Sequence, residues 1–143
     1  MSENTELLEF IYKNAKMGEV TLPLVIGMVS RPDLRKALSS QLVEYCAIGD
    51  EVKNTLRRCG TVPREPGGMK SAVAETMLHL DSMTGRSPRH IAEMMIRGST
   101  MGTIQMSKRI NAYRYTAGEE ALALADRLLK TEENNIEQMK AFL

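Results

Sequence analysis

The sequence contains no tryptophan, and aromatic residues make up only 4% of its 143 residues. Because aromatic side chains favour strands, this composition suits helices better than sheets. The apolar volume of a core must come instead from leucine, isoleucine, valine, alanine and 11 methionines, whose flexible side chains fill irregular spaces. A chain of this length can bury one core, so we expect a single domain over residues 1–143.

An excess of charge of either sign is also missing. There are 19 lysines and arginines against 18 aspartates and glutamates, and both signs are spread along the chain. Without a basic face, the sequence argues against a binder of phosphate backbones and against a polybasic membrane anchor. We therefore expect neither nucleic acid nor a membrane as a partner.

Long apolar runs are absent too. The longest uncharged run, VTLPLVIGMVS at residues 20–30, contains Pro23 and is too short to span a bilayer. The first residues, MSENTELLEFIYK, are acidic and amphipathic, unlike the basic start and apolar centre of a secretory signal. We therefore expect a cytoplasmic protein.

The two cysteines, Cys46 and Cys59, lie on one expected helix, roughly 20 Å apart at about 1.5 Å per residue. That separation is too large for a disulfide, and neither cysteine has a neighbour typical of a metal site. The sequence also lacks a glycine-rich phosphate loop, a nucleophile elbow and a CxxC motif. It therefore predicts no catalytic residue.

Helix start and stop signals along the chain predict five helices and no strand. Gly60 is a natural stop, TVPREPGG is an expected loop, and Pro23 is expected to kink or locally break the first helix near its end. The predicted helices cover residues 5–29, 30–60, 69–83, 87–115 and 116–143, and the third is closed by Thr84-Gly85.

Polar residues at three of the predicted helix starts are expected to act as caps. Ser30 with Asp33, and Thr116 with Glu119, have the spacing of a capping box, in which two side chains satisfy free backbone N–H groups. Ser87, followed by a proline in the first turn, is expected to cap the fourth helix.

Apolar residues in steps of three and four form seams along the first, second and last predicted helices, which is typical of bundles with shallow crossing angles. The first two helices form one expected hairpin, and the last two form another. About 28 residues separate the hairpins, enough for a crossover that contains the third helix. The expected fold class is all-α: a four-helix bundle with a short fifth helix in the crossover between two helical hairpins.

Three stretches carry a resemblance to a known superfamily. RPDLRKALSSQLVEYCAIGDEVKNTLRRCG, followed by a loop rich in proline and glycine, resembles the second helix of small ferritin-like bundle proteins, including spore-coat and uncharacterised branches. SPRHIAEMMIRGSTMG and RLLKTEENNIEQMKAFL are similar to an uncharacterised bacterial ferritin-like branch. The resemblance implies a ferritin-like bundle, whose metal enzymes place a Glu on each of two helices and a Glu-x-x-His on each of the other two.

One polar residue on each long helix is expected near the bundle centre. The candidate metal ligands are Glu19, Glu44, Gln105 and Glu132, with Asn135 one turn after Glu132. Neither histidine of the di-iron pattern is present, so the site is degenerate, and carboxylates alone favour a hard ion such as Mg²⁺, Ca²⁺ or Mn²⁺. We expect no cofactor, with Fe or Mn at a carboxylate-rich centre as the alternative.

A buried polar network is the favoured interpretation of the same residues. An isolated carboxylate is costly to bury, so Glu132 needs a hydrogen bond, a proton or access to solvent or a subunit partner. The expected hydrogen-bond partners of Glu132 are Asn135, Gln105, Tyr45 and Tyr113.

His90 and Glu93 have the three-residue spacing of a metal-binding pair, but in reversed order. A helical wheel places them on a polar ridge with Arg97, so we expect both to face water. His79 is expected to approach His90 across the turn, with Asp81 nearby. A metal site at this corner is the alternative to surface histidines.

Four glycines fall on or beside core-facing positions in mid-helix, where each costs about 1 kcal/mol relative to alanine. These glycines are Gly18, Gly49, Gly98 and Gly102. Close helix packing over Gly98-x-x-x-Gly102 is the favoured explanation. The alternative is an adaptable apolar pocket among the nearby methionines, which are Met94, Met95, Met101 and Met106.

The function expected from these features is a non-catalytic structural, stress-related or interaction role that retains the bundle with a degenerate di-iron site. The alternatives are a metal-binding protein or enzyme with a carboxylate-rich centre, and a spore-coat-like assembly subunit. We also expect a homo-oligomer, with a dimer as the simplest form, through the methionine-rich fourth helix or the VTLPLVIGMV stretch.

Overall fold

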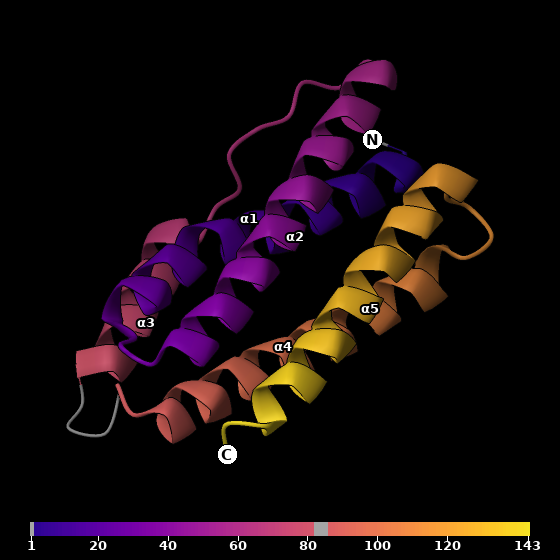
Figure 1. The fold of residues 1–143 in the computed structure, drawn as a ribbon. Helices are drawn as coiled ribbons and strands as arrows, with labels where there is room; N and C mark the ends of the chain where they lie inside the picture. The colour runs from indigo at the N-terminus through magenta and orange to yellow at the C-terminus, as the bar shows by residue number, and fades with distance from the viewer. Residues whose placement is uncertain (1, 82–85) are drawn as a thin grey trace.

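The computed structural model describes residues 2–81 and 86–143, which form five α-helices and contain no strand (Figure 1). The helices are α1 (Glu3–Met28), α2 (Pro32–Arg58), α3 (Met69–Asp81), α4 (Pro88–Tyr113) and α5 (Glu119–Lys140). The all-α prediction is confirmed, and α1 continues through Pro23 without a break. The predicted stop of the third helix at residues 83–85 lies outside the described residues.

The capping prediction is confirmed for α4 and wrong for α2. Ser87 Oγ accepts a hydrogen bond of 3.1 Å from the backbone N–H of His90. At the start of α2 the N-cap is Arg31 rather than Ser30, because Pro32 occupies the first helical position. Asp33 bonds instead to the backbone N–H of Leu34 at 2.9 Å.

The capping box predicted for α5 is also wrong. The N-cap is Gly118, which has no capping side chain, because Thr116 is still part of the turn that follows α4. The backbone N–H of Thr116 donates to the carbonyl of Tyr113 at 3.1 Å. The N–H of Gly118 donates to Oδ1 of Asn4, 2.8 Å away, so a long-range contact with α1 takes part in this helix start.

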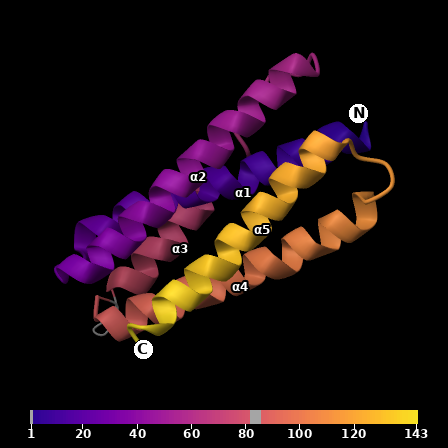
Figure 2. The same cartoon turned by 45° about the vertical axis from the view of Figure 1, so that its right-hand side comes forward.

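The four long helices form two hairpins, α1 with α2 and α4 with α5, which pack against each other (Figure 2). At one end of the bundle, Asn4 contacts both Cys59 and Gly118, and the Tyr113 hydroxyl donates to Glu6 at 3.0 Å. At the other end, where α2 begins and α5 ends, the Arg31 guanidinium lies over the Phe142 ring. Helices α2 and α4 therefore run in one direction, and α1 and α5 run in the other.

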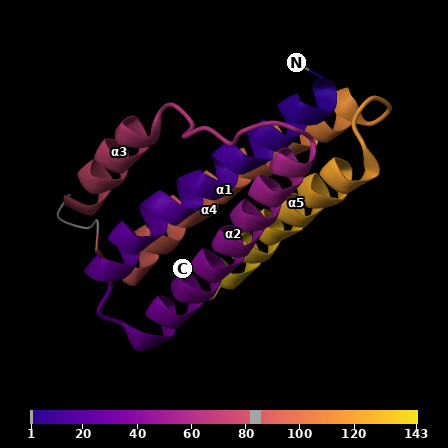
Figure 3. The same ribbon diagram turned by 90° about the horizontal axis from the view of Figure 1, so that it is seen from above.

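The link between the hairpins returns along the bundle, as its length led us to expect, and it contains α3 (Figure 1). Helix α3 packs on the outer side of α1 (Figure 3). Leu80 is the one fully enclosed side chain among the residues of α3 that the structure describes. Helix α3 therefore contributes one side chain, Leu80, to the core and otherwise covers α1 from the outside.

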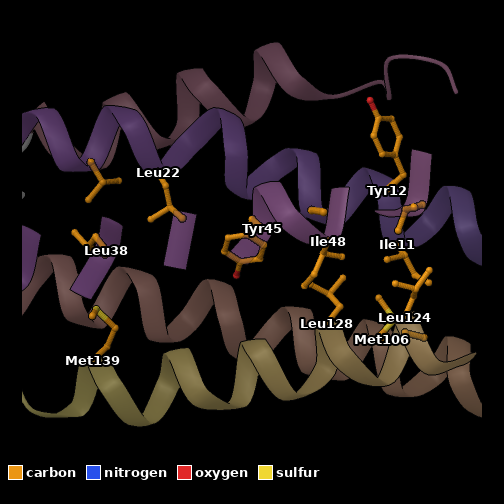
Figure 4. Packing of buried hydrophobic residues seen from close by; sticks show 14 of the residues in the cluster. Ile11, Tyr12, Leu22, Leu38, Tyr45, Ile48, Met106, Leu124, Leu128 and Met139 are labelled. Atoms are coloured by element: carbon orange, nitrogen blue, oxygen red, sulfur yellow. The ribbon is translucent and has the colours of Figure 1, made fainter. Parts of the chain in front are cut away.

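Apolar side chains from all four long helices form the core (Figure 4). Leu22, Leu38 and Met139 lie on one side of Tyr45, and Ile48 and Leu128 lie on the other side. Tyr45 thus brings a hydroxyl into the middle of the bundle, between these apolar side chains. No helix in the described parts of the chain has both the length and the apolar character needed to cross a membrane.

Candidate functional site

A buried polar cluster lies at the centre of the bundle. Its members, here called the central polar cluster, are Tyr45 on α2, Ser99 on α4, and Glu132 and Asn135 on α5. The Tyr45 hydroxyl donates to Glu132 Oε1 at 2.8 Å, and the Asn135 amide donates to the Tyr45 oxygen at 3.0 Å. Of the four partners expected for Glu132, Tyr45 is the one that bonds to it directly.

Burial dominates the electrostatics of this cluster. It raises the pKa of Glu132, and hydrogen bonding by Ser99 and Tyr45 lowers that pKa in part. Burial and the neighbouring Glu132 charge together raise the pKa of Tyr45 well above its usual value. Among the described residues no lysine, arginine or histidine forms an ion pair with Glu132. The carboxylate therefore has hydrogen-bond support but no compensating charge.

Two glycines make room for this cluster. A Cβ at Gly18 of α1 would lie 2.6 Å from ring atoms of Tyr45, which is too close for any side chain. A Cβ at Gly102 of α4 would lie 3.0 Å from Cδ of Glu132. The glycines thus let α1 rest on the tyrosine ring and α4 rest on the carboxylate, so their cost in helix propensity is offset by close packing.

Gly98 behaves differently from these two glycines. A Cβ built at this position would meet nothing within 4 Å, so no neighbouring helix rests there. The close packing predicted over the whole Gly98-x-x-x-Gly102 strip is therefore wrong at its first glycine. Gly98 instead lies at the edge of an open hollow.

This hollow, of about 540 Å³, lies between α1, α3 and α4 and reaches the central polar cluster. Its volume falls within the range of about 300–1,000 Å³ that is typical of small-molecule sites. Buried residues form its floor: Leu22, Val25, Tyr45, Ser99 and Glu132. The remaining methionines, charged residues and histidines that line the hollow are more exposed than its floor: Met17, Glu75, His79, His90, Glu93, Met94, Met95, Arg97 and Met101.

The methionine-rich face of α4 both packs against the core and lines this hollow. The buried residues of α4 are Ile91, Ala92, Ser99 and Met106. Met94 and Met95 are half-buried, and Met101 is 55% exposed. Core packing explains this face only in part: Met106 is buried in the core and Met94 and Met95 pack against it, but Met101 is largely exposed beside the hollow.

The five candidate metal ligands do not converge on one point. Glu132 and Asn135 lie together in the central polar cluster, and Gln105 lines the hollow without belonging to that cluster. Nε2 of Gln105 lies 3.8 Å from the sulfur of Met101. No three His, Cys, Asp or Glu side chains within residues 2–81 and 86–143 are grouped so that they could hold a metal ion.

The other two candidates, Glu44 and Glu19, pair with cations away from the centre. Glu44 accepts a hydrogen bond of 2.9 Å from Arg127 on α5, so it belongs to the outer surface of the α2–α5 contact. Glu19 lies 3.4 Å from Lys16, and its Oε1 would be 3.3 Å from a Cβ at Gly49. Both glutamates therefore pair with a lysine or an arginine and do not contact Glu132 at the bundle centre.

His90 and Glu93 are half-buried residues that line the hollow, so the prediction that both face water holds only for part of each side chain. The rings of His79 and His90 lie 6.5 Å apart, which agrees with the expected approach across the turn. Nε2 of His90 is buried and has no hydrogen-bond partner among the described residues. Asp81, the third candidate at this corner, lies 4.0 Å from Arg86 instead.

Ser99 is the functional residue that sequence reasoning missed. Its only signal is the spacing Ser99-x-x-Gly102, which puts a hydroxyl and a glycine on the same face of a helix. That pattern is common on helix surfaces. Only the position of Glu132 on the neighbouring α5 makes it part of a site.

Two alanine substitutions test the different roles of these glycines. We expect Gly18→Ala to lower the free energy of unfolding by about 1–2 kcal/mol, because the new methyl group overpacks the Tyr45 ring. We expect Gly98→Ala to raise it by about 0.5–1 kcal/mol, since alanine favours the helix and meets no neighbour. Denaturant unfolding measures both values. Equal stabilisation by the two substitutions would contradict this packing.

Glu132→Gln tests the cost of the buried carboxylate. Burial raises the folded-state pKa of Glu132, so its contribution to stability is fully present below the unfolded pKa and is lost as pH rises through the folded pKa. The variant should therefore gain stability relative to the unmodified chain as the pH rises above the usual glutamate pKa of about 4.3. The exposed neighbour Glu133, changed to Gln, is the matched control. The same dependence of stability on pH in both variants would show that burial of the Glu132 carboxylate has no specific cost.

Comparisons with known proteins found no match for this chain. No protein-family model, no curated protein and no solved structure matches the chain. Function must therefore be inferred from the chain's own residues, above all from the central polar cluster and the hollow that reaches it.

Proposed function

We propose that the chain is a non-catalytic, ferritin-like helical bundle that binds one small organic molecule in the hollow between α1, α3 and α4. The observation that carries this proposal is the hollow itself, which has a volume of about 540 Å³ and extends from solvent to the buried carboxylate of Glu132. A mostly apolar cavity with a few polar groups at its floor is the common form of a small-molecule site.

The helix directions support the ferritin-like part of the proposal. Two antiparallel hairpins are joined by a link that returns along the bundle, and this is the arrangement that the sequence resemblance implies. At the bundle centre, Glu132 bonds to Tyr45, and Asn135 occupies the place of the histidine in a Glu-x-x-His pair. A hydrogen-bonded cluster thus takes the position where a di-iron centre would be expected.

Two features of the hollow have a cost in stability that the contacts of the described residues do not fully offset. Gly98 is a mid-helix glycine beside empty space, and Glu132 is a carboxylate that is only 7% exposed and has no ion pair among the described residues. Sites that bind ligands commonly keep such destabilising features. Both features are explained if the hollow is shaped to receive a molecule.

The polar groups at the floor favour binding over a reaction. The Tyr45 hydroxyl and the Asn135 amide are engaged with other members of the cluster, which fixes the carboxylate in one orientation. Glu19 and Glu44 pair with Lys16 and Arg127, so they do not join Glu132 in a carboxylate-rich centre for Fe or Mn. The homodimer, the spore-coat-like assembly and the cytoplasmic location stay predictions.

Titration with Nile red, a neutral apolar dye, tests this proposal. The chain should show saturable binding to one site, because the hollow offers an apolar wall that water fills poorly. Gly98→Leu places a side chain at the edge of the hollow and should weaken binding about tenfold or more, equivalent to about 1.4 kcal/mol.

Gly27→Leu is the matched control for this experiment. Gly27 is exposed on α1, a Cβ there would also meet nothing within 4 Å, and it does not line the hollow. The control should bind the dye like the unmodified chain. Equal losses in both variants, or no saturable binding by a chain whose circular dichroism shows intact helices, would contradict the proposal.

A further inference from the structure

The cations nearest to Glu132 along α5 are committed to other carboxylates. Arg127 bonds to Glu44 and Glu51, and Lys130 lies 2.8 Å from Asp126. The last cation of the helix, Lys140, pairs with an exposed glutamate one turn before it. The charge of Glu132 is therefore not neutralised by its own helix.

The Glu132 carboxylate retains room for another donor. An ionised carboxylate offers about four acceptor positions, and the Tyr45 hydroxyl takes one of them on Oε1. Ser99 also hydrogen-bonds to the group. A primary ammonium brings three N–H donors and a positive charge, and charge-assisted hydrogen bonds to a carboxylate are roughly twice as strong as neutral ones.

The charged side chains around the hollow favour a cationic ligand over an anionic one. Glu75 on α3 and Glu93 on α4 line it in addition to Glu132, against the single guanidinium of Arg97. Three carboxylates and one guanidinium give the hollow an excess of negative charge. Such a potential attracts cations and disfavours a carboxylate-bearing molecule.

The walls of the hollow determine the rest of the ligand. Leu22 and Val25 give a fixed apolar surface on α1, and Met94, Met95 and Met101 give an adaptable one on α4. Methionine side chains adjust to irregular apolar shapes. A molecule that reaches Glu132 must therefore pass an apolar wall, which calls for an apolar body behind its charged end.

A bare divalent cation is a poorer fit than an organic cation. Ca²⁺ takes six to eight oxygen ligands, and Mg²⁺ demands near-ideal octahedral geometry. Glu132 is the one buried carboxylate at this floor in the described parts of the chain, and no metal-type group of three side chains is present there. An ammonium group needs only one carboxylate and neutral acceptors, which this floor provides.

We propose that the ligand is a primary amine with an apolar body, whose ammonium group pairs with Glu132 while the body lies against the methionines of α4. This inference rests on the proposed function, because it names the class of molecule that the same hollow binds. Tyr45 and Ser99 hold the carboxylate in place, and Gly102 gives it a flat surface on which to rest.

Isothermal titration with three molecules of equal chain length tests the charge preference. Octylamine, octanol and octanoate share an apolar tail and differ in the charge of the head group. We expect octylamine to bind about tenfold or more tightly than octanol, and octanoate to bind most weakly. In Glu132→Gln the preference for octylamine should disappear, while the affinity for octanol stays the same.

Glu93→Gln is the matched control, because it removes one negative charge from the rim of the hollow without touching its floor. It should reduce the preference for octylamine by no more than about threefold, since a partly exposed charge contributes little. Equal losses in both variants would assign the preference to net charge and overturn the pairing with Glu132.

The remaining outcomes separate this inference from the proposed function. If octylamine and octanol bind equally to the unmodified chain, the hollow binds apolar molecules without selecting an amine, and the present inference is wrong. If the folded chain binds none of the three molecules and no Nile red, the proposed function itself is wrong.

Discussion

The hydrogen bond from Tyr45 to Glu132 joins the two hairpins at the middle of the bundle. Asn135 and Ser99 add the remaining hydrogen bonds of this cluster, and the packing around it is apolar or places a glycine against a side chain. A tyrosine ring fills the space between α1 and α2 only because Gly18 allows it, and a glutamate lies under α4 only because Gly102 allows it. This hydrogen bond also fixes the relative register of α2 and α5, since a shift of one turn would remove the tyrosine donor from a buried carboxylate.

The hollow follows from the same arrangement. Helix α4 packs mainly against α5 and contacts α1 less, while α3 lies outside α1 and encloses the space only in part. The carboxylate of Glu132 is thus central in the bundle and yet forms the floor of a cavity that opens to solvent. A structural polar network needs no such opening, which is why binding explains the site better than support of the fold alone.

The sequence predicted the helices, the two hairpins, the Ser87 cap and the inward position of Glu132, because these depend on periodicity and local cap chemistry. It could not predict that Glu44 pairs with Arg127, because a helical wheel shows which face a residue occupies and not which side chain of the next helix meets it. The sequence also could not separate the methionines of α4 that pack in or against the core from Met101, which is exposed beside the hollow, because both kinds have the same helical periodicity. The role of Gly98 depends on the distance to α1, which no local pattern encodes.

Carbon-13 NMR of the glutamate side-chain carboxyls, with the Glu132 signal assigned by its absence in Glu132→Gln, measures the state of the central group directly. Burial without a compensating cation predicts a titration midpoint above the usual glutamate pKa of about 4.3. It also predicts that the midpoint falls when octylamine is bound, because the ammonium stabilises the ionised carboxylate. A midpoint at or below the usual value in the free chain would show that the carboxylate is solvated or already paired, and would contradict the account.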